Sequence, residues 1–377
     1  MKGKNNYLFL VNEVSDEIRQ HYDDSYEYNV DVDKFIESQK SKEDYLEKQN
    51  ITYNMFVVPD KSILLRKFLP FDTKEPVRVL NDLSGYVHDL SIVLNEHDYY
   101  LTDSHVTKVS GLKCISYILS TMHPENSISD YYKLLWDKLH IVLEPHKGDL
   151  LYNDNWSYGV DDYYKKYLNI TVIELMLNNE IENMNNYLPK EFKVFKSRPT
   201  SYFRNEHSIS DKKAIVLRDS STEKMKIPLI SYYREVIFYW DYWYFNKNLI
   251  EWFKPDDVIE IRTERFLSNP VSPILKDNEN VKIMLLRDII NFSVSKNTLI
   301  FEAIIKDEHL MPVNTTVLFS IDDEKIIQES KTNELGLCKS KIDISNLNKG
   351  KHTLNYKVKE TENTKLTEYA MNFIIRE

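Results

Sequence analysis

Two short stretches, far apart in the chain, carry the residue types of one hydrolytic site. The first is Thr102-Asp103-Ser104-His105, and the second is Ala214 to Ser221, an apolar run followed by Asp219-Ser220. A serine is a weak nucleophile at neutral pH and needs a general base, which in turn needs an orienting partner. Ser220, His105 and Asp103 could fill these three roles if the fold brings the stretches together. The chemistry would then be acyl transfer.

Each stretch also has a purely structural interpretation. An Asp-x-His pair occurs often by chance in a solvated loop, and Ser220 could cap the N-terminus of a helix. A serine at a strand-to-helix turn is at the same time surrounded by backbone N–H groups. Such groups could form an oxyanion hole, in which each donor contributes about 3–4 kcal/mol.

The elements that must position these residues alternate between apolar runs, which predict strands, and helical spacing. The predicted strands are Ile51–Val58, Ala214–Leu217 and Val258–Ile261. The predicted helices are Asp33–Gln49, Gly111–Met122, Val172–Asn185 and Leu229–Phe238. Strands separated by helices indicate an α/β fold with a mostly parallel sheet and helices on both faces. Ligands bind at the carboxyl ends of the strands in such a sheet.

A second, all-β region is predicted beyond a Pro- and Asn-rich stretch that begins at Ser268. The helical patterns stop there, and short β-like runs separated by turn-forming residues take their place. These runs are Asn297–Ile305, Thr315–Ile321, Lys339–Ile344, His352–Val358 and Glu368–Ile375. We therefore predict a catalytic domain of residues 1–272 and a β-sandwich domain of residues 280–377, joined by a linker.

Composition excludes several classes of function. The chain has 377 residues and a net charge of −10, and an acidic chain lacks the basic face that nucleic-acid binding needs. The two cysteines, Cys114 and Cys338, indicate neither a disulfide framework nor a metal cluster. No histidine spacing is typical of metal ligands, so no metal and no cofactor are expected.

The compartment stays open at this point. No run reaches the ~18 consecutive apolar residues that a membrane span needs. The apolar run Leu8–Val11, which follows Lys2 and Lys4, is too short for the core of a signal peptide. We expect either a cytoplasmic chain or a targeting segment that this sequence does not include.

Six stretches, in the same order, resemble the alginate O-acetyltransferase (AlgX/AlgJ-like) family, whose catalytic domain is SGNH-hydrolase-like. They are Lys4–Leu10, Phe56–Lys61, Tyr99–His105, Lys147–Leu150, Leu217–Ser220 and Lys254–Leu267. Tyr99–His105 is similar to the family's Y-Y-x-T-D-x-H-W, and Leu217–Ser220 is similar to its R-D-S-F. The Asp-x-His element precedes the serine here, as it does in that family.

The resemblance implies Ser220 as the nucleophile, His105 as the general base and Asp103 as its orienter. It implies an O-acetyltransferase that moves an acetyl group through a serine acyl-enzyme to a hydroxyl of a cell-surface polysaccharide. The acetyl donor could come from a membrane acyltransferase, and the work would be extracytoplasmic. Two departures leave the shape of the pocket open: Val106 replaces a Trp and Ser221 replaces a Phe.

Two other functions fit the same residues. A carbohydrate acetyl esterase would use the same triad with water as the acceptor, and a non-catalytic glycan-binding or adhesion protein would not use it. The C-terminal domain suits all three as a glycan-binding module or a spacer. The aromatic run Tyr239–Phe245 could stack on sugars, although such rings more often pack in a core.

Further candidates for contact with substrate or oxyanion are Asp219, Arg218, Arg265, Lys61 and Asp149. Three of them have structural alternatives. Arg265 could pair with Glu260 or Glu264, Lys61 could lie in solvent, and Asp149 could cap a turn.

Overall fold

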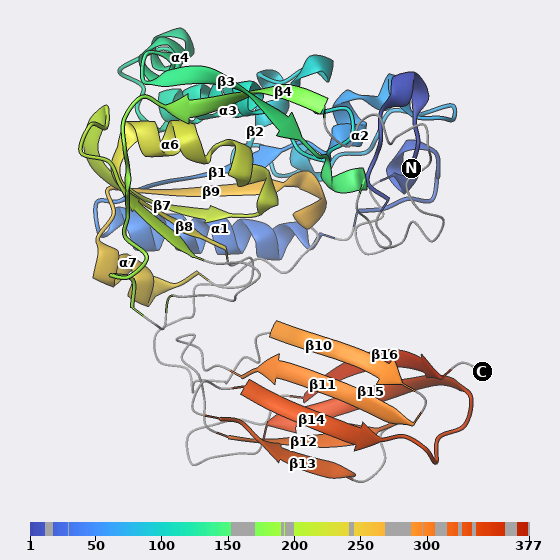
Figure 1. Cartoon of the computed structure of the whole chain (residues 1–377). Helices are drawn as coiled ribbons and strands as arrows, with labels where there is room; N and C mark the ends of the chain where they lie inside the picture. The colour runs from blue at the N-terminus through green and yellow to red at the C-terminus, as the bar shows by residue number, and fades with distance from the viewer. Residues whose placement is uncertain are drawn as a thin grey trace. The chain divides into compact units, whose positions relative to one another are not determined.

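Figure 1 shows the computed structural model of the chain, which divides into two compact units. Residues described here are 1–11, 18–28, 30–151, 170–189, 192, 200–240, 245–267, 288–295, 297–305, 315–322, 326–333, 337–358 and 368–375. The first unit is Met1–Phe245 with Ile250–Ile274, and the second is Asn246–Leu249 with Leu275–Glu377. The expected linker and the limits at residues 272 and 280 lie outside the described residues, so both stay predictions.

A seven-stranded sheet in the order β2-β1-β9-β7-β8-β6-β5 forms the centre of the first unit. Its strands are β1 (Thr52–Val58), β2 (His88–Asp89), β5 (Glu182–Asn183), β6 (Ser201–Arg204), β7 (Ser210–Arg218), β8 (Tyr233–Tyr239) and β9 (Asp257–Thr263). The strands from β2 to β8 in this order run parallel, and β6 and β5 add an antiparallel edge. The predicted mostly parallel α/β sheet is confirmed.

Helices cover both faces of this sheet, with α1 on one face and α3 and α6 on the other (Figure 1). The helices are α1 (Val32–Glu47), α2 (Lys61–Leu64), α3 (Lys108–Met122), α4 (Ile128–Trp136), α6 (Lys226–Tyr232) and α7 (Lys247–Phe253). The 3₁₀ turns are η1 (Lys4–Asn6), η2 (Arg19–His21), η3 (Arg66–Phe68), η4 (Val79–Asn81), η5 (Leu90–Ile92), η6 (Glu96–Asp98), η7 (Asp149–Leu151), η9 (Ser220–Lys224) and η10 (Glu264–Phe266). Among the described helices, none has the length and apolar character needed to cross a membrane.

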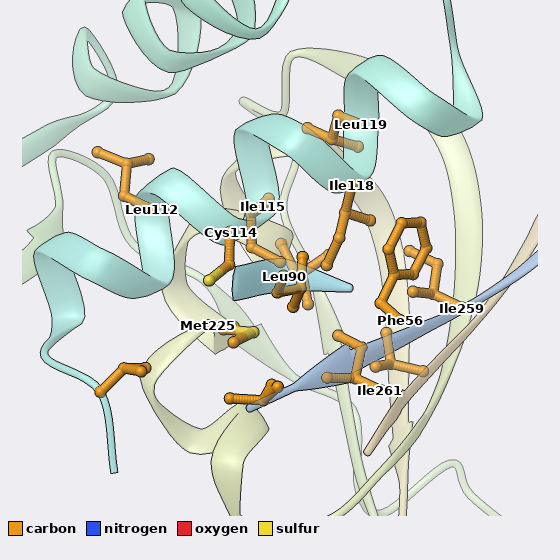
Figure 2. Close-up of a cluster of buried hydrophobic side chains, with 14 of the residues drawn as sticks. Phe56, Leu90, Leu112, Cys114, Ile115, Ile118, Leu119, Met225, Ile259 and Ile261 are labelled. Carbon is orange, nitrogen blue, oxygen red and sulfur yellow. The ribbon is translucent and has the colours of Figure 1, made fainter. Parts of the chain in front are cut away.

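The interior strand β9 shows how the sheet is held from both faces. Ile259 and Ile261 belong to the apolar cluster that includes Ile115 and Ile118 of α3 (Figure 2). Burying each such side chain contributes about 1.5–3 kcal/mol. Glu260, between the two isoleucines, is buried and accepts a hydrogen bond of 2.6 Å from Lys42 of α1. Packing and pairing on opposite faces therefore fix the position of the strand's carboxyl end.

The predicted helix Val172–Asn185 is wrong. This segment contains the strands β4 (Ile170–Leu177) and β5, and β4 pairs antiparallel with β3 (Leu139–His146) in a separate two-stranded sheet. The β-branched residues Ile170 to Ile173 favour an extended chain, because they pack well against a cross-strand neighbour.

The predicted helix Leu229–Phe238 is right only in its first part. The helix α6 ends at Tyr232, and the strand β8 begins at the next residue. Val236 to Phe238 are fully buried and pair with β7 in the interior of the sheet. Apolar spacing alone could not separate a buried strand from the end of a helix.

The second unit contains two antiparallel sheets, β10-β11-β14 and β13-β12-β15-β16. Their strands are β10 (Asp288–Ser295), β11 (Thr298–Ile304), β12 (Thr316–Ile321), β13 (Gln328–Lys331), β14 (Leu337–Asp343), β15 (Gly350–Val358) and β16 (Glu368–Ile375). Phe301 of one sheet meets Phe319 of the other, with ring centroids 5.1 Å apart in a shared apolar core. The predicted β-sandwich is confirmed, and β10 and β13 are strands that the sequence analysis missed.

Candidate active site

The loop before α3 holds a histidine against a buried carboxylate. Oδ1 of Asp103 accepts hydrogen bonds from the backbone N–H of His105 at 2.9 Å and from its Nδ1 at 2.7 Å. Nδ1 therefore carries the hydrogen, which leaves Nε2 as the acceptor nitrogen of the neutral ring. This Nε2 is buried and has no hydrogen-bond partner among the described residues. Since Asp103 is only 4% exposed, the alternative of a solvated loop is wrong.

The charges around His105 favour its protonated form. Burial lowers the pKa of His105, but the hydrogen bond to Asp103 and the charges of Asp103 and Asp149 outweigh it, with Arg265 opposing them, and the net pKa is raised. Burial also raises the pKa of Asp103, yet the hydrogen bonds from His105 and the close contact with His146 hold it well below its usual range. Asp103 thus stays ionised while His105 gains and loses a proton.

The ammonium group of Lys61 holds this loop in place through hydrogen bonds. It donates to the carbonyl oxygens of Leu8 at 2.7 Å, Tyr100 at 2.7 Å, Leu101 at 3.1 Å and Asp103 at 3.0 Å. The side chain is buried, so the alternative of a solvated lysine is wrong. The candidate role in substrate contact is not supported either, because the charge is used to hold backbone carbonyls.

Ser220 lies at the turn from β7 to η9, as predicted. Asp219, not Ser220, is the N-cap residue, so the capping interpretation of Ser220 is wrong. Asp219 is fully buried and accepts from the N–H of Ser221 at 2.8 Å, from its hydroxyl at 2.5 Å and from the N–H of Thr263 at 2.6 Å. Asp219 therefore shapes the turn rather than contacting substrate, and the Ser221 N–H is not free for an oxyanion hole. Ser220 itself is partly exposed.

The fold brings the two stretches to the same edge of the sheet. Lys61, which holds the Asp103 loop, follows the carboxyl end of β1, and Ser220 follows that of β7. Only β9 separates these strands, and neighbouring strands are about 4.8 Å apart. Lys224 of η9 places its ammonium 4.9 Å from the centre of the Tyr100 ring, which belongs to the Asp103 loop.

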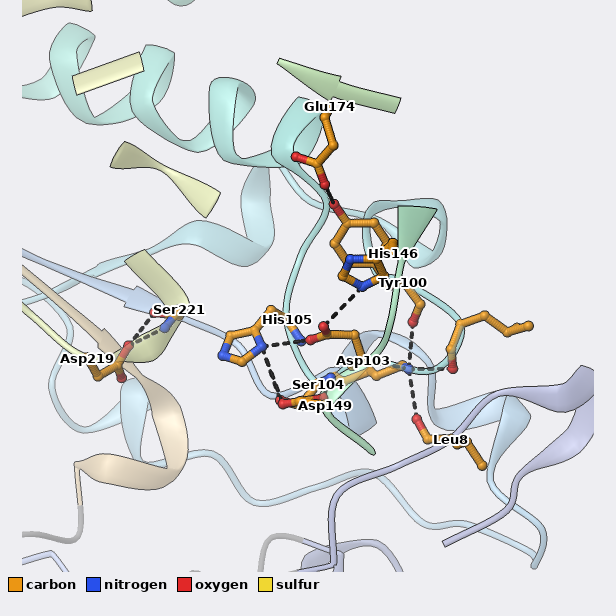
Figure 3. Close-up of polar contacts among 12 residues, drawn as sticks. Leu8, Tyr100, Asp103, Ser104, His105, His146, Asp149, Glu174, Asp219 and Ser221 are labelled. Carbon is orange, nitrogen blue, oxygen red and sulfur yellow. Dashed lines mark hydrogen bonds and ion pairs between the residues drawn. The ribbon is translucent and has the colours of Figure 1, made fainter. Parts of the chain in front are cut away.

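Nε2 of His105 is directed toward the serine turn. In Figure 3 the ring extends from Asp103 toward the segment that carries Asp219 and Ser221. The backbone of α3 also packs directly on η9, since a Cβ at Gly111 would lie 2.2 Å from the carbonyl oxygen of Lys224. Within the described contacts, no hydrogen bond joins Ser220 to His105, so the complete triad stays a prediction.

Two arginines predicted to contact substrate are engaged elsewhere. Arg265 forms an ion pair with Asp60 at the end of β1, so the alternative of pairing with Glu260 or Glu264 is wrong. Arg218 is buried, pairs with Glu223 at 2.5 Å and stacks over the ring of Trp240. Arg265 nevertheless influences His105, because its charge lowers the pKa of that histidine.

Asp149 lies beside the Asp103 loop. It accepts from the Ser104 N–H at 2.7 Å and from the Ser104 hydroxyl at 2.5 Å, and its Oδ2 lies 3.4 Å from Nδ1 of His105. It therefore does more than cap a turn, because it supplies a second negative charge to the histidine. Polar atoms of Asp103, His105 and Asp149 lie within 4.8 Å of one another. Asp103 and His105 are hydrogen-bonded to each other and Asp149 accepts from Ser104, and we assign no metal to the group.

The sequence analysis missed His146, the last residue of β3. Its Nε2 lies 3.1 Å from Oδ2 of Asp103, and its ring stacks on Tyr100 with centroids 4.1 Å apart (Figure 3). No residue spacing links His146 to the Asp-x-His pair. The available hint was its position immediately before Lys147–Leu150, one of the stretches that carries the family resemblance.

The remaining predicted features are part of the protein interior. Val106 is fully buried, and the hydroxyl of Ser221 donates to Asp219. Both residues that differ from the family pattern therefore make contacts inside the protein. Tyr239 and Phe245, the ends of the aromatic run, are buried as core packing predicts. Residues 241–244 between them lie outside the described residues.

Comparison with known proteins gives distant structural likenesses. No protein-family model and no curated protein matches the chain. PatB1 of Bacillus cereus is similar over 64% of this chain and 93% of its own, with 12% identity and a TM-score of 0.45. The O-acetyltransferase domain of AlgJ from Pseudomonas putida is similar over 74% of this chain and 95% of its own, with 12% identity and a TM-score of 0.40.

A longer likeness is to AlgX of Pseudomonas aeruginosa, over 91% of this chain and 86% of that one, with 10% identity and a TM-score of 0.37. The family expected from the six stretches is thus represented among the similar structures. With identities of 10–13% and TM-scores below 0.5, these likenesses do not decide the function. The functional proposal depends on the site itself.

Proposed function

We propose that this chain is an O-acetyltransferase of the SGNH type, with Ser220 as nucleophile, His105 as general base and Asp103 as its orienter. The main support is the state of His105. Asp103 holds its Nδ1 at 2.7 Å, and its Nε2 is buried without a partner at the edge of the sheet where Ser220 emerges. A general base needs a nitrogen that is both oriented and available.

The proposed reaction has two halves. In the first, the Ser220 oxygen attacks the carbonyl carbon of the acetyl donor, and Nε2 of His105 takes the hydroxyl proton. Collapse of the tetrahedral intermediate breaks the bond to the leaving group, which receives that proton, and leaves acetyl-Ser220. In the second half, an acceptor hydroxyl gives its proton to His105 and attacks the acetyl carbonyl. The proton then returns to the serine oxygen as the acetylated acceptor leaves.

Asp103 suits the supporting role in both halves. Its pKa is held low, so it remains a carboxylate and stabilises the imidazolium that forms at each transfer. In other serine triads, changing the orienting carboxylate to an amide reduces turnover by about 10⁴-fold. Lys61 adds rigidity, because it holds the carbonyl of Asp103 itself at 3.0 Å.

The proposed acceptor is a hydroxyl of a cell-surface polysaccharide. This choice comes from the motif resemblance of Tyr99–His105 and Leu217–Ser220, since the geometry of the triad is the same for a sugar or for water. The same resemblance makes an extracytoplasmic site and a membrane-supplied acetyl donor part of the proposal.

The test is incubation with an activated acetyl ester, with and without neutral and acidic oligosaccharides, followed by mass spectrometry. Acetylated oligosaccharide with the wild type, and none with Ser220→Ala, is the expected result. Free acetate that is unaffected by any acceptor would identify an esterase. If neither product nor acetylated protein forms, the triad is not functional and a glycan-binding role replaces the proposal.

A further inference from the structure

Asp103 is held by two histidines that come from different elements. His105 occupies Oδ1, and Nε2 of His146 lies 3.1 Å from Oδ2. Nε2 of His146 is buried, and apart from this ion-pair contact it has no hydrogen-bond partner in the described part of the chain. Because the carboxylate is ionised, this 3.1 Å contact is favourable only when the nitrogen carries a hydrogen, so we infer that Nε2 is the protonated nitrogen of His146.

The surroundings of His146 keep its ring in place. The ring lies nearly parallel to that of Tyr100, at an interplanar angle of 18°. The hydroxyl of Tyr100 donates to Glu174 at 3.1 Å, and Glu174 also pairs with Lys108 at the start of α3. Since Glu174 belongs to β4, both strands of the β3–β4 hairpin contribute to this arrangement (Figure 3).

The backbone that follows His146 is packed against the same loop. A Cβ at Gly148 would lie 2.0 Å from the carbonyl oxygen of Thr102, so only glycine permits this approach. The N–H of Leu150 donates to the same oxygen at 3.2 Å. The hairpin end and the Asp103 loop are therefore one packed unit, and His146 cannot move independently of Asp103.

We propose that His146 is a positioning residue for the acyl transfer, which fixes the plane of the Asp103 carboxylate and limits how strongly Asp103 attracts the proton of His105. The inference depends on the proposed function, because the proton transfer it tunes is that between Ser220 and His105. An N–H group placed beside a carboxylate stabilises the ionised form and so lowers its basicity. Partners that orient a functional side chain from behind typically change activity by 10–100-fold when removed.

Three variants separate positioning from simple packing. His146→Phe keeps a ring to stack on Tyr100 but removes the donor, whereas His146→Gln keeps an N–H donor without the ring. His140→Phe, on the same strand, is the matched control, because His140 is exposed and contacts Asn178 instead. Removing the donor leaves Asp103 more basic, so the pKa of His105 rises and more of the base is protonated at a given pH.

The charged groups that act on His105 are Asp103, Asp149 and Arg265, and His146 acts on it through Asp103. All except His146 are unchanged in the variants. For His146→Phe we expect kcat on a chromogenic acetyl ester to fall about 10–100-fold with little change in KM. The acidic limb of its pH profile moves to higher pH, His146→Gln restores part of both, and His140→Phe changes neither.

The experiment combines this pH profile with an NMR titration of the His105 imidazole in the same four proteins. A higher His105 pKa in His146→Phe, without a change in His140→Phe, supports the inference. An unchanged His105 pKa in His146→Phe overturns it. The titration does not depend on turnover, so it tests the inference by itself. A wild type whose activity does not depend on His105 would overturn the proposed function and leave the result of the titration unaffected. If His146→Phe does not fold, the ¹⁵N shifts of wild-type His146 decide. Hydrogen on Nε2 supports the inference, and hydrogen on Nδ1 alone overturns it.

Discussion

Two aspartate–histidine pairs lie at opposite ends of the same parallel strands. At the carboxyl ends, Asp103 holds His105. At the amino ends, Asp257, the first residue of β9, lies 2.9 Å from Nε2 of His123. Both carboxylates are buried, and both contacts are short. Judged by the pair alone, either could serve as an oriented base.

The second nitrogen of each ring distinguishes the two pairs. Nδ1 of His123 lies 3.1 Å from the ammonium of Lys212, and Tyr233 also donates to Asp257 at 2.9 Å. Nε2 of His105 has no partner in the described part of the chain. A buried polar atom without a partner costs about 1–3 kcal/mol, and such costs are typical of functional sites. The pair whose histidine has both ring nitrogens engaged is suited to stability, and the pair whose histidine keeps one nitrogen without a partner is suited to proton transfer.

The largest effect is expected when Ser220, the proposed partner of the His105 Nε2, loses its hydroxyl. Ser220→Ala is expected to reduce turnover of an activated acetyl ester by about 10⁴–10⁶-fold, because triad residues act as a unit. Ser221→Ala is the matched control. Its hydroxyl contacts Asp219, so we expect a stability loss of about 1 kcal/mol with most of the turnover retained. Equal activity loss in both variants would contradict the assignment of Ser220.

The second test exchanges the histidines of the two pairs for glutamine. His105→Gln should lose about 10⁴-fold or more in turnover and keep its melting temperature, since it removes the base. His123→Gln should keep turnover and lose about 1–3 kcal/mol of unfolding free energy, since it disrupts a buried hydrogen-bonded network. Denaturant unfolding and ester hydrolysis measure both effects. The reverse pattern would show that His123 belongs to the functional pair.

The third test concerns Lys61, which holds the loop that carries Asp103 and His105. Lys61→Met removes a charged donor from four backbone carbonyls, and we expect a loss of about 3–5 kcal/mol in unfolding free energy. Lys67→Met is the control, because Lys67 is exposed and its pair with Glu96 is worth about 0–1 kcal/mol. Similar denaturant midpoints for the two variants would show that Lys61 does not hold the loop.

The smallest effect expected is a shift in pH dependence. His105 accepts a proton only when neutral, so turnover falls as the pH drops through its pKa. The charge of Asp149 raises this pKa. Asp149→Asn should therefore move the acidic limb of kcat/KM to lower pH, whereas Asp137→Asn, at the exposed position that follows α4, should not. A limb that moves upward would mean that Asp149 acts on another group.

The sequence was sufficient where the signal is local. Asp103 and His105 are two residues apart, and an apolar run leads directly to Ser220, so spacing and strand pattern identified the candidate site. The parallel sheet followed in the same way from the strands around Val58, Leu217 and Ile261. These features depend on side-chain periodicity within a few residues, which sequence patterns record well.

The sequence was insufficient where a role depends on distant partners. Lys61 is buried because four carbonyls from residues 8 and 100–103 surround it, and no neighbour in sequence indicates this. His146 reaches Asp103 because β3 pairs with β4, a strand whose residues were predicted to be helical. An error in one secondary structure element therefore concealed a member of the site.

The central claim is that Ser220 is the nucleophile that His105 serves. It is tested most directly by acid-quenching the wild type after brief exposure to an activated acetyl ester, then mapping the acetyl group by peptide mass spectrometry. We predict acetylation of Ser220 that is lost in Ser220→Ala and strongly slowed in His105→Gln. An acetyl group on another residue, or one that forms equally fast without His105, would contradict the claim.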